Sequence, residues 1–158
     1  MIEYPAHLPD WSLKSQWILD SYHHWTGQHL IDPDETPEDR ARQLFEVPFA
    51  VLAHGTQSDP ILMYANRTTL ELWEITLDEL FQTPSRLTAE PVHRDERAQL
   101  LHRVAKDGWI DDYSGIRISH TGKRFWIEQA TVWNLRDEHA QPAGQAAMFT
   151  RWRPIEPT

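Results

Sequence analysis

Five polar residues carry most of the binding chemistry in this sequence, since each is expected at the end of an element or on a strand with apolar neighbours: Asn66, Arg86, Glu90, His93 and Arg117. Arginine offers a two-pronged fork to an anion, and asparagine offers a donor and an acceptor together. If these side chains lie close together in the fold, they could bind a carboxylate or a heterocycle. The alternative is structural: Asn66 caps a helix and Arg117 faces solvent. In that interpretation Arg86 and Glu90 pair and fix a loop.

Eight tryptophans form a second set of candidates. A fully buried indole ring contributes on the order of 4–6 kcal/mol, so core packing alone would account for them. Stacked rings also suit a flat ligand, and four could line such a pocket: Trp73, Trp109, Trp126 and Trp133. Three lie on the first expected helix, where they could cover a sheet or form a dimer seam: Trp11, Trp17 and Trp25. The residues that we predict to bind a ligand are Tyr64, Asn66, Trp73, Arg86, His93, Trp109, Tyr113, Arg117 and Trp133.

Patterns typical of catalysis are weak in this chain. Glu90 and His93, three residues apart, could act as an acid–base pair with Arg117 as a substrate anchor. The sequence has neither a GxSxG elbow nor a glycine loop of the phosphate-binding type. We therefore predict that the protein is not an enzyme, and keep a small-molecule enzyme as an alternative.

Composition limits the partners. The net charge is −9, and residues 1–100 carry 7 Lys and Arg against 17 Asp and Glu. A surface of that sign repels a phosphate backbone, so nucleic acid is not an expected partner. No apolar run approaches the roughly 20 residues that a bilayer span needs, so we expect no membrane association and a cytoplasmic location.

The elements that must position these residues follow from periodicity and caps. Helical spacing predicts helices over 11–26, 36–45, 66–73 and 95–106, and a capping box at Thr76–Glu79 predicts another short helix. Apolar runs and alternation predict strands over 49–53, 61–64, 114–118, 125–133 and 145–152. On the second-last strand the alternation places one set of residues on one face: Phe125, Ile127, Gln129, Thr131 and Trp133.

Four segments of the chain give it a family resemblance: HGTQSDPILMYANRTTLELWE (54–74), TPSRLTAEPVHRDER (83–97), GWIDDYSGIRISHTGKRFWIEQATVWNL (108–135) and GQAAMF (144–149). In these segments it resembles the MEKHLA domain family, a PAS-related group found as stand-alone bacterial proteins and at the end of certain plant homeodomain-leucine-zipper regulators. We expect a stand-alone bacterial member, because the sequence contains no homeodomain or zipper.

The resemblance implies an α+β, PAS-like fold with a five-stranded antiparallel sheet, helices on one face and an N-terminal helical cap. We expect residues 1–47 to form the cap, 48–153 the core and 154–158 a tail. The first strand should pair beside the last one in the centre of the sheet.

Cofactors of PAS domains are only weakly indicated. The absence of cysteine excludes a covalent flavin adduct and thiolate metal sites, while non-covalent flavin remains open. Haem also remains open through His102, although Leu101 and Val104 fit the inward face of that helix better. The nine histidines show no HExxH motif, so no metal site is predicted.

The function implied by the resemblance is sensory or regulatory, through a small ligand or through contact with a protein partner. The alternative is a ligand-free dimerisation module that uses the tryptophans of the first helix. A cavity of roughly 300 Å³ or more would favour ligand binding, and a filled interior would favour the interaction module.

Overall fold

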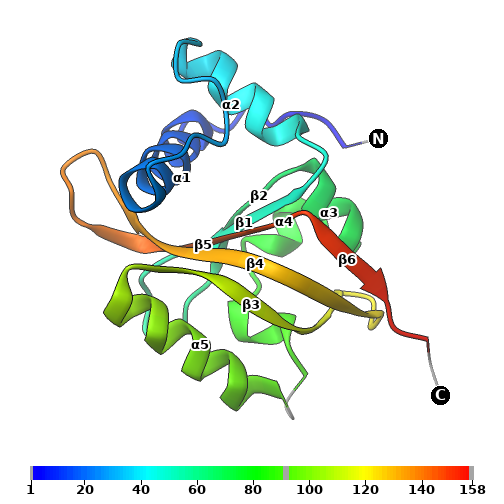
Figure 1. Cartoon of the computed structure of the whole chain (residues 1–158). Coiled ribbons are helices and arrows are strands. Elements are labelled where there is room, and N and C mark those ends of the chain that lie inside the picture. Colours follow the sequence, from blue (N-terminus) through cyan, green and yellow to red (C-terminus); the bar gives the residue numbers. More distant parts are fainter. Residues whose placement is uncertain (1, 91–92, 157–158) are drawn as a thin grey trace.

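One antiparallel sheet organises the chain, with helices on both of its faces (Figure 1). The computed structural model describes residues 2–90 and 93–156. The six strands are β1 (Ala50–His54), β2 (Leu62–Ala65), β3 (Trp109–Ile118), β4 (Arg124–Arg136), β5 (Pro142–Phe149) and β6 (Arg151–Pro154).

The strand order is β2-β1-β5-β4-β3, with β6 paired to β4 alone. Strand β1 therefore lies in the sheet interior beside β5, as the sequence predicted, with Leu52 opposite Ala147. The single last strand predicted over 145–152 is wrong, because the chain bends at Thr150. Strand β5 pairs with residues 131–136 of β4, whereas β6 pairs with residues 125–128.

The helical segments of the described residues that cover the two faces are α1 (Trp11–Thr26), α2 (Pro37–Glu46), α3 (Arg67–Trp73), α4 (Leu77–Leu80), the 3-10 helix η1 (Ser85–Thr88) and α5 (Arg94–Asp107). Helix α1 packs on one face, where Trp11 stacks on Tyr64 with ring centroids 4.5 Å apart. Helices α3 to α5 lie on the other face (Figure 1). The predicted cap therefore covers the sheet face opposite the other helices.

The tryptophans of α1 contact this chain's own sheet. Trp11 is buried, and the Trp25 indole donates a hydrogen bond of 2.9 Å to the Asn134 carbonyl on β4. Trp17 is half-buried, and its Nε1 donates to Glu138 over 3.1 Å. Trp11 and Trp25 therefore cover the sheet, whereas Trp17 contacts the loop after β4, and a role of these rings in a dimer stays a prediction.

A β-bulge in β4 changes which residues share a face. Gln129 has a positive φ of 49°, and the pairing with β3 loses register at this point. A bulge adds one residue to one strand, so every later side chain moves to the opposite face. Ile127 and Val132 consequently face α5, whereas Trp133 faces α1 and meets Tyr22 edge-on with ring centroids 5.1 Å apart. The predicted common face for Phe125 and Trp133 is therefore wrong.

Asn66 ties three segments together at the start of α3. Its Oδ1 accepts hydrogen bonds from Val51 N (3.1 Å), Thr69 N (3.2 Å) and Thr69 Oγ1 (2.8 Å). Its Nδ2 donates to Leu44 O (3.3 Å) and Phe49 O (2.8 Å). Both amide hydrogens and all acceptor capacity are used, so the helix-cap interpretation of Asn66 is confirmed.

We expect Asn66→Ala to lower the free energy of unfolding by about 3–4 kcal/mol, because it leaves buried backbone groups of β1 and α2 without partners. Thr36→Ala is the matched control, since Thr36 caps α2 at an exposed position and should cost only about 1 kcal/mol. Urea denaturation of both variants gives the comparison. Equal losses of unfolding free energy in the two variants would show that Asn66 contributes no more than an ordinary helix cap.

Candidate ligand-binding cavity

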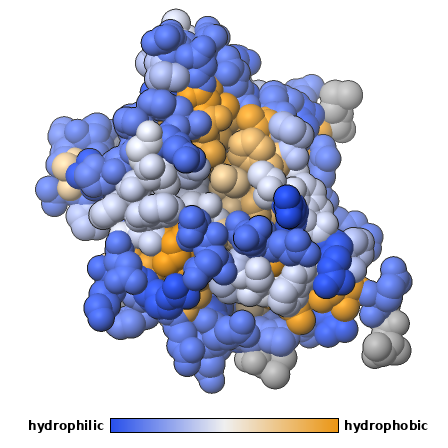
Figure 2. Space-filling model, viewed as in Figure 1, coloured by the Kyte–Doolittle hydropathy of each residue, from blue (hydrophilic) through white to orange (hydrophobic). Residues whose placement is uncertain are grey.

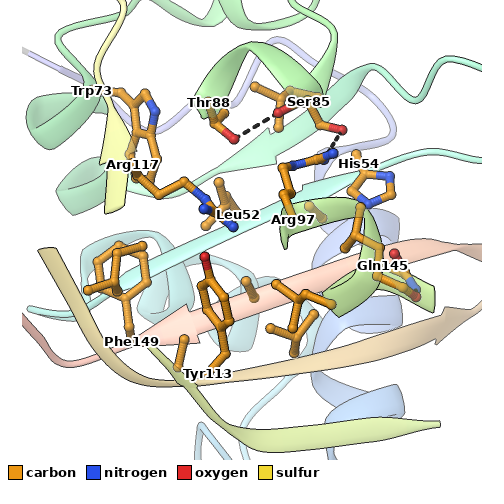
Figure 3. Close-up of a pocket in the computed structure, with 18 residues that line it drawn as sticks. Leu52, His54, Trp73, Ser85, Thr88, Arg97, Tyr113, Arg117, Gln145 and Phe149 are labelled. Carbon is orange, nitrogen blue, oxygen red and sulfur yellow. Dashed lines mark hydrogen bonds between the residues drawn. The ribbon is translucent and has the colours of Figure 1, made fainter. Parts of the chain in front are cut away.

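A cavity lies between the sheet and the helices α3 to α5 (Figure 3). Its floor is formed by apolar side chains of β1, β4 and β5, among them Leu52, Ile127, Val132, Ala147 and Phe149. Its roof comes from α3, η1 and α5 through Trp73, Ser85, Thr88, Arg97 and Leu100. Tyr113 and Arg117 of β3 close one side, and His54 and Gln145 close another. The cavity therefore has an apolar floor and several polar groups above and beside it.

The volume of this cavity is about 70 Å³. The sequence left two possibilities open, a large pocket and a filled interior. The observed volume matches neither of them. Pockets for drug-sized ligands measure roughly 300–1,000 Å³, so this cavity has room for a few water molecules or for a ligand of a few non-hydrogen atoms. An isoalloxazine or a porphyrin does not fit.

Two arginines border the cavity from different elements. Arg117 on β3 is only 8% exposed, and its guanidinium lies over the Tyr113 ring, 4.9 Å from the centroid. The expectation that Arg117 faces solvent is therefore wrong. Arg97 projects from α5 and donates from Nη2 to Ser85 Oγ over 2.6 Å (Figure 3). In the part of the chain that the structure describes, neither side chain forms a salt bridge.

Burial disfavours the charge on both guanidinium groups and lowers the pKa of each. Burial lowers the pKa of Arg97 to about 10, and the positive charge of Arg117 contributes to the same shift. Burial also lowers the pKa of Arg117, while the Tyr113 oxygen partly opposes the shift. Both groups remain charged at neutral pH, so the cavity wall carries two positive charges.

The glycine at 115 gives Tyr113 its position. Tyr113, Gly115 and Arg117 alternate on β3 and share the face toward the cavity. A Cβ at Gly115 would lie 2.8 Å from Cζ of Tyr113, closer than real contacts allow. The missing side chain therefore lets the Tyr113 ring lie along the strand under Arg117, and its hydroxyl points into the centre of the cavity (Figure 3).

His54 and Gln145 separate the cavity from solvent. Both residues also line an open groove that is bordered by Trp25, Gln57 and Pro142. The His54 Nδ1 donates to Gly55 O over 3.1 Å, and its buried Nε2 has no hydrogen-bond partner among the residues that the structure describes. Gln145 donates from Nε2 to Leu101 O over 3.2 Å. The groove and the cavity thus share one wall of two polar side chains.

Three of the predicted ligand-binding residues meet at the cavity: Trp73, Tyr113 and Arg117. The buried Trp73 Nε1 has no hydrogen-bond partner in the described structure. Three others lie on the sheet face under α1: Tyr64 stacks on Trp11, Trp133 meets Tyr22, and Trp109 pairs in register with Trp133. The β4 bulge is the reason that Trp133 leaves the cavity face.

The remaining predicted residues occupy structural positions. Asn66 has no hydrogen-bonding capacity left for a ligand. Arg86 is exposed on η1 and pairs with Asp59 at 3.2 Å, not with Glu90. His93 lies at the first turn of α5, outside the cavity lining. Glu90 lies 3.6 Å from Arg124, so the acid–base pair and anchor considered for catalysis are not assembled at the cavity.

Sequence reasoning missed Arg97, because it placed Leu101 and Val104 on the inward face of helix α5 and did not extend that face to Arg97. The structure buries Leu100 and Val104 and exposes Ala98. Arg97 lies three residues before Leu100 and seven before Val104, which is the spacing of one helix face. That spacing could have identified Arg97. His102 is exposed, so it does not face the cavity as an axial haem ligand would.

Two further features concern residues 2–90 and 93–156. No group of three or more metal-ligating side chains comes together there. No helix in that part of the chain has the length and apolar character to cross a bilayer.

The sequence profile of the MEKHLA domain matches residues 13–154. This chain belongs to the MEKHLA domain family. Curated relatives include the homeobox-leucine zipper proteins ATHB-14 (28% identical over 141 residues) and REVOLUTA (26% over 129 residues) of Arabidopsis thaliana. The matches cover 87% and 80% of this chain but 16% and 15% of those proteins. This MEKHLA chain therefore spans about a sixth of the length of those relatives.

Solved structures confirm the PAS fold of this MEKHLA domain. The PAS domain of a protein from Colwellia psychrerythraea matches with a TM-score of 0.59 and 18% identity, over 75% of this chain and 95% of that one. An RNA-binding light-oxygen-voltage receptor matches with a TM-score of 0.63 and 16% identity, over 79% of this chain and 36% of that one. The α+β PAS-like prediction is confirmed.

The burial of His54 predicts a pH-dependent stability. Burial lowers its pKa from 6.5, and the charge of Arg97 acts in the same direction, whereas the Gly55 hydrogen bond opposes both. The unfolded chain therefore takes up this proton first as the pH falls. The resulting loss of stability begins near pH 6.5 and continues down to the lowered pKa.

We expect His54→Gln to make the free energy of unfolding less dependent on pH between 7.5 and 5.5, as measured by urea denaturation across that range. His102→Gln, at an exposed position on α5, should keep the wild-type slope. Equal slopes for His54→Gln and wild type would contradict the assignment of the pH dependence to His54.

Proposed function

We propose that this MEKHLA domain is a non-catalytic sensory or regulatory domain that binds a small molecule in the cavity and passes the signal on by protein contact. The observation that carries the proposal is the cavity itself, because four elements bring polar side chains with spare hydrogen-bonding capacity to one space between the sheet and the helices. A stable interior normally fills its voids and satisfies its polar groups. A ligand that occupies the space would do both.

The position of the cavity also fits a role in signalling. It lies between the sheet and α5, and its walls include residues of α3, η1 and β3. A ligand bound there contacts several elements at once, so it can favour one arrangement of α5 and η1 over another. Such a shift requires that the ligand bind the two arrangements with different affinities.

A second candidate is the ligand-free interaction module, and the outer surface of α1 favours it. Leu13 is 41% exposed, and the half-buried Trp17 follows one helical turn later on the same face. Hydrophobic residues also gather in a hollow below α2 in the space-filling view (Figure 2). These surfaces could receive a partner protein or a second copy of the chain.

Mass spectrometry of small molecules released from gently purified protein separates the two candidates. We expect wild-type protein to release one small compound in near-stoichiometric amount. Ala130→Leu should release none, because the added methyl groups enter the cavity from β4. Ala98→Leu, at an exposed position on α5, should behave as wild type. Protein that carries no compound, even after exposure to a metabolite extract, would leave the interaction module as the supported function.

A further inference from the structure

A buried guanidinium, that of Arg117, and a half-buried one, that of Arg97, border the cavity, and neither forms a salt bridge within the described residues. In the described part of the chain, the side chain of Arg117 makes one hydrogen bond, from Nη1 to Ile116 O over 3.0 Å. The side chain of Arg97 also makes one, to Ser85 Oγ. A guanidinium has five N–H donors, so most donors of both groups remain available.

Two acidic side chains favour the charged forms of these arginines, but one already forms a salt bridge elsewhere and the other is exposed. Asp59 lies in the salt bridge with Arg86, and Glu96 lies on the exposed face of α5. Each acts on its arginine only through space, without forming a salt bridge to it. An uncompensated buried charge is strongly unfavourable, and two neighbouring positive charges make it more so. An anion between Arg97 and Arg117 would compensate both.

The neutral groups around the arginines also select for a negative ligand. Burial raises the pKa of Tyr113, so its hydroxyl remains protonated and can donate a hydrogen bond. The Trp73 Nε1 is a buried donor without a partner, and an indole nitrogen can only donate. Donors thus outnumber acceptors on this side of the cavity, as an anion requires.

The size and the floor of the cavity restrict the class of anion. An inorganic phosphate would direct some of its oxygens at Leu52, Ile127 or Phe149, which offer no hydrogen bonds. A carboxylate concentrates its charge in two oxygens that match the planar fork of arginine. Its hydrocarbon part can lie on the apolar floor, and a volume of about 70 Å³ permits only a short one.

We propose that the cavity binds a small aliphatic monocarboxylate, held between the guanidinium groups of Arg97 and Arg117, with its hydrocarbon end on the floor formed by β1, β4 and β5. This rests on the proposed function and specifies its ligand class. Tyr113 and Trp73 add neutral donors, and Ser85 holds Arg97 in place.

Propionate and its uncharged isostere propionamide test the proposal by isothermal titration calorimetry and thermal unfolding, in a buffer without carboxylates or phosphate. We expect propionate to bind and to raise the melting temperature of wild-type protein, and propionamide and inorganic phosphate to do neither. Loss of one charge-assisted contact in Arg117→Met should weaken propionate binding about ten- to a hundredfold. Arg103→Met, at an exposed position on the same helix as Arg97, should stay within about twofold of wild type. Arg97→Gln, which removes the other cavity guanidinium, should weaken propionate binding as well and gives an independent second measurement.

The outcomes distinguish this proposal from the proposed function. Propionamide or phosphate binding as tightly as propionate would overturn the carboxylate class and leave small-molecule binding intact. A neutral compound released from the purified protein would do the same. Equal propionate affinity in wild type and both cavity arginine variants would overturn the assigned site. Absence of any bound or binding molecule would overturn both proposals.

Discussion

The constraint on which this account of the protein depends is a pair of guanidinium groups at one cavity, Arg117 buried and Arg97 half-buried, neither of which forms a salt bridge within the described residues. A fold of this size has a net stability of only about 5–15 kcal/mol, so uncompensated interior charges are expensive to keep. Arg117 is buried near the C-terminal end of β3, and Arg97 reaches the same space from α5. Both side chains border a cavity whose floor is apolar, which points to a ligand as the missing partner.

The fold supplies this arrangement through a few local features. Gly115 leaves room for the Tyr113 ring beneath Arg117. The bulge at Gln129 turns Ala130 and Val132 toward the cavity and Trp133 toward α1, which separates a ligand face from a packing face. The hydrogen bonds of Asn66 fix β1, α2 and α3 relative to each other. The cavity is therefore bordered by elements whose positions are set elsewhere in the molecule.

Much of this architecture was predictable from local signals. Gly27 ends α1 with a φ of 73°, and the capping box at Thr76 and Glu79 begins α4, as their residue types indicate. The division of the C-terminal segment into β5 and β6 was not predictable, because both pair with β4 and nothing at Thr150 signals a break. The site was only partly predictable. Alternation along β4 placed Trp133 on the wrong face, because a bulge is a tertiary feature without a clear sequence signal. The helical spacing of Arg97 with Leu100 and Val104, in contrast, was visible in the sequence and was missed.

The free energy of unfolding of Arg117→Met in ligand-free protein is the most direct test of the central constraint. Replacement of an uncompensated buried charge by an apolar side chain of similar length should leave stability unchanged or raise it. The account therefore predicts that the variant is at least as stable as wild type in urea denaturation. A loss of about 3 kcal/mol or more would show that the protein itself already compensates the charge of Arg117, and would contradict the account.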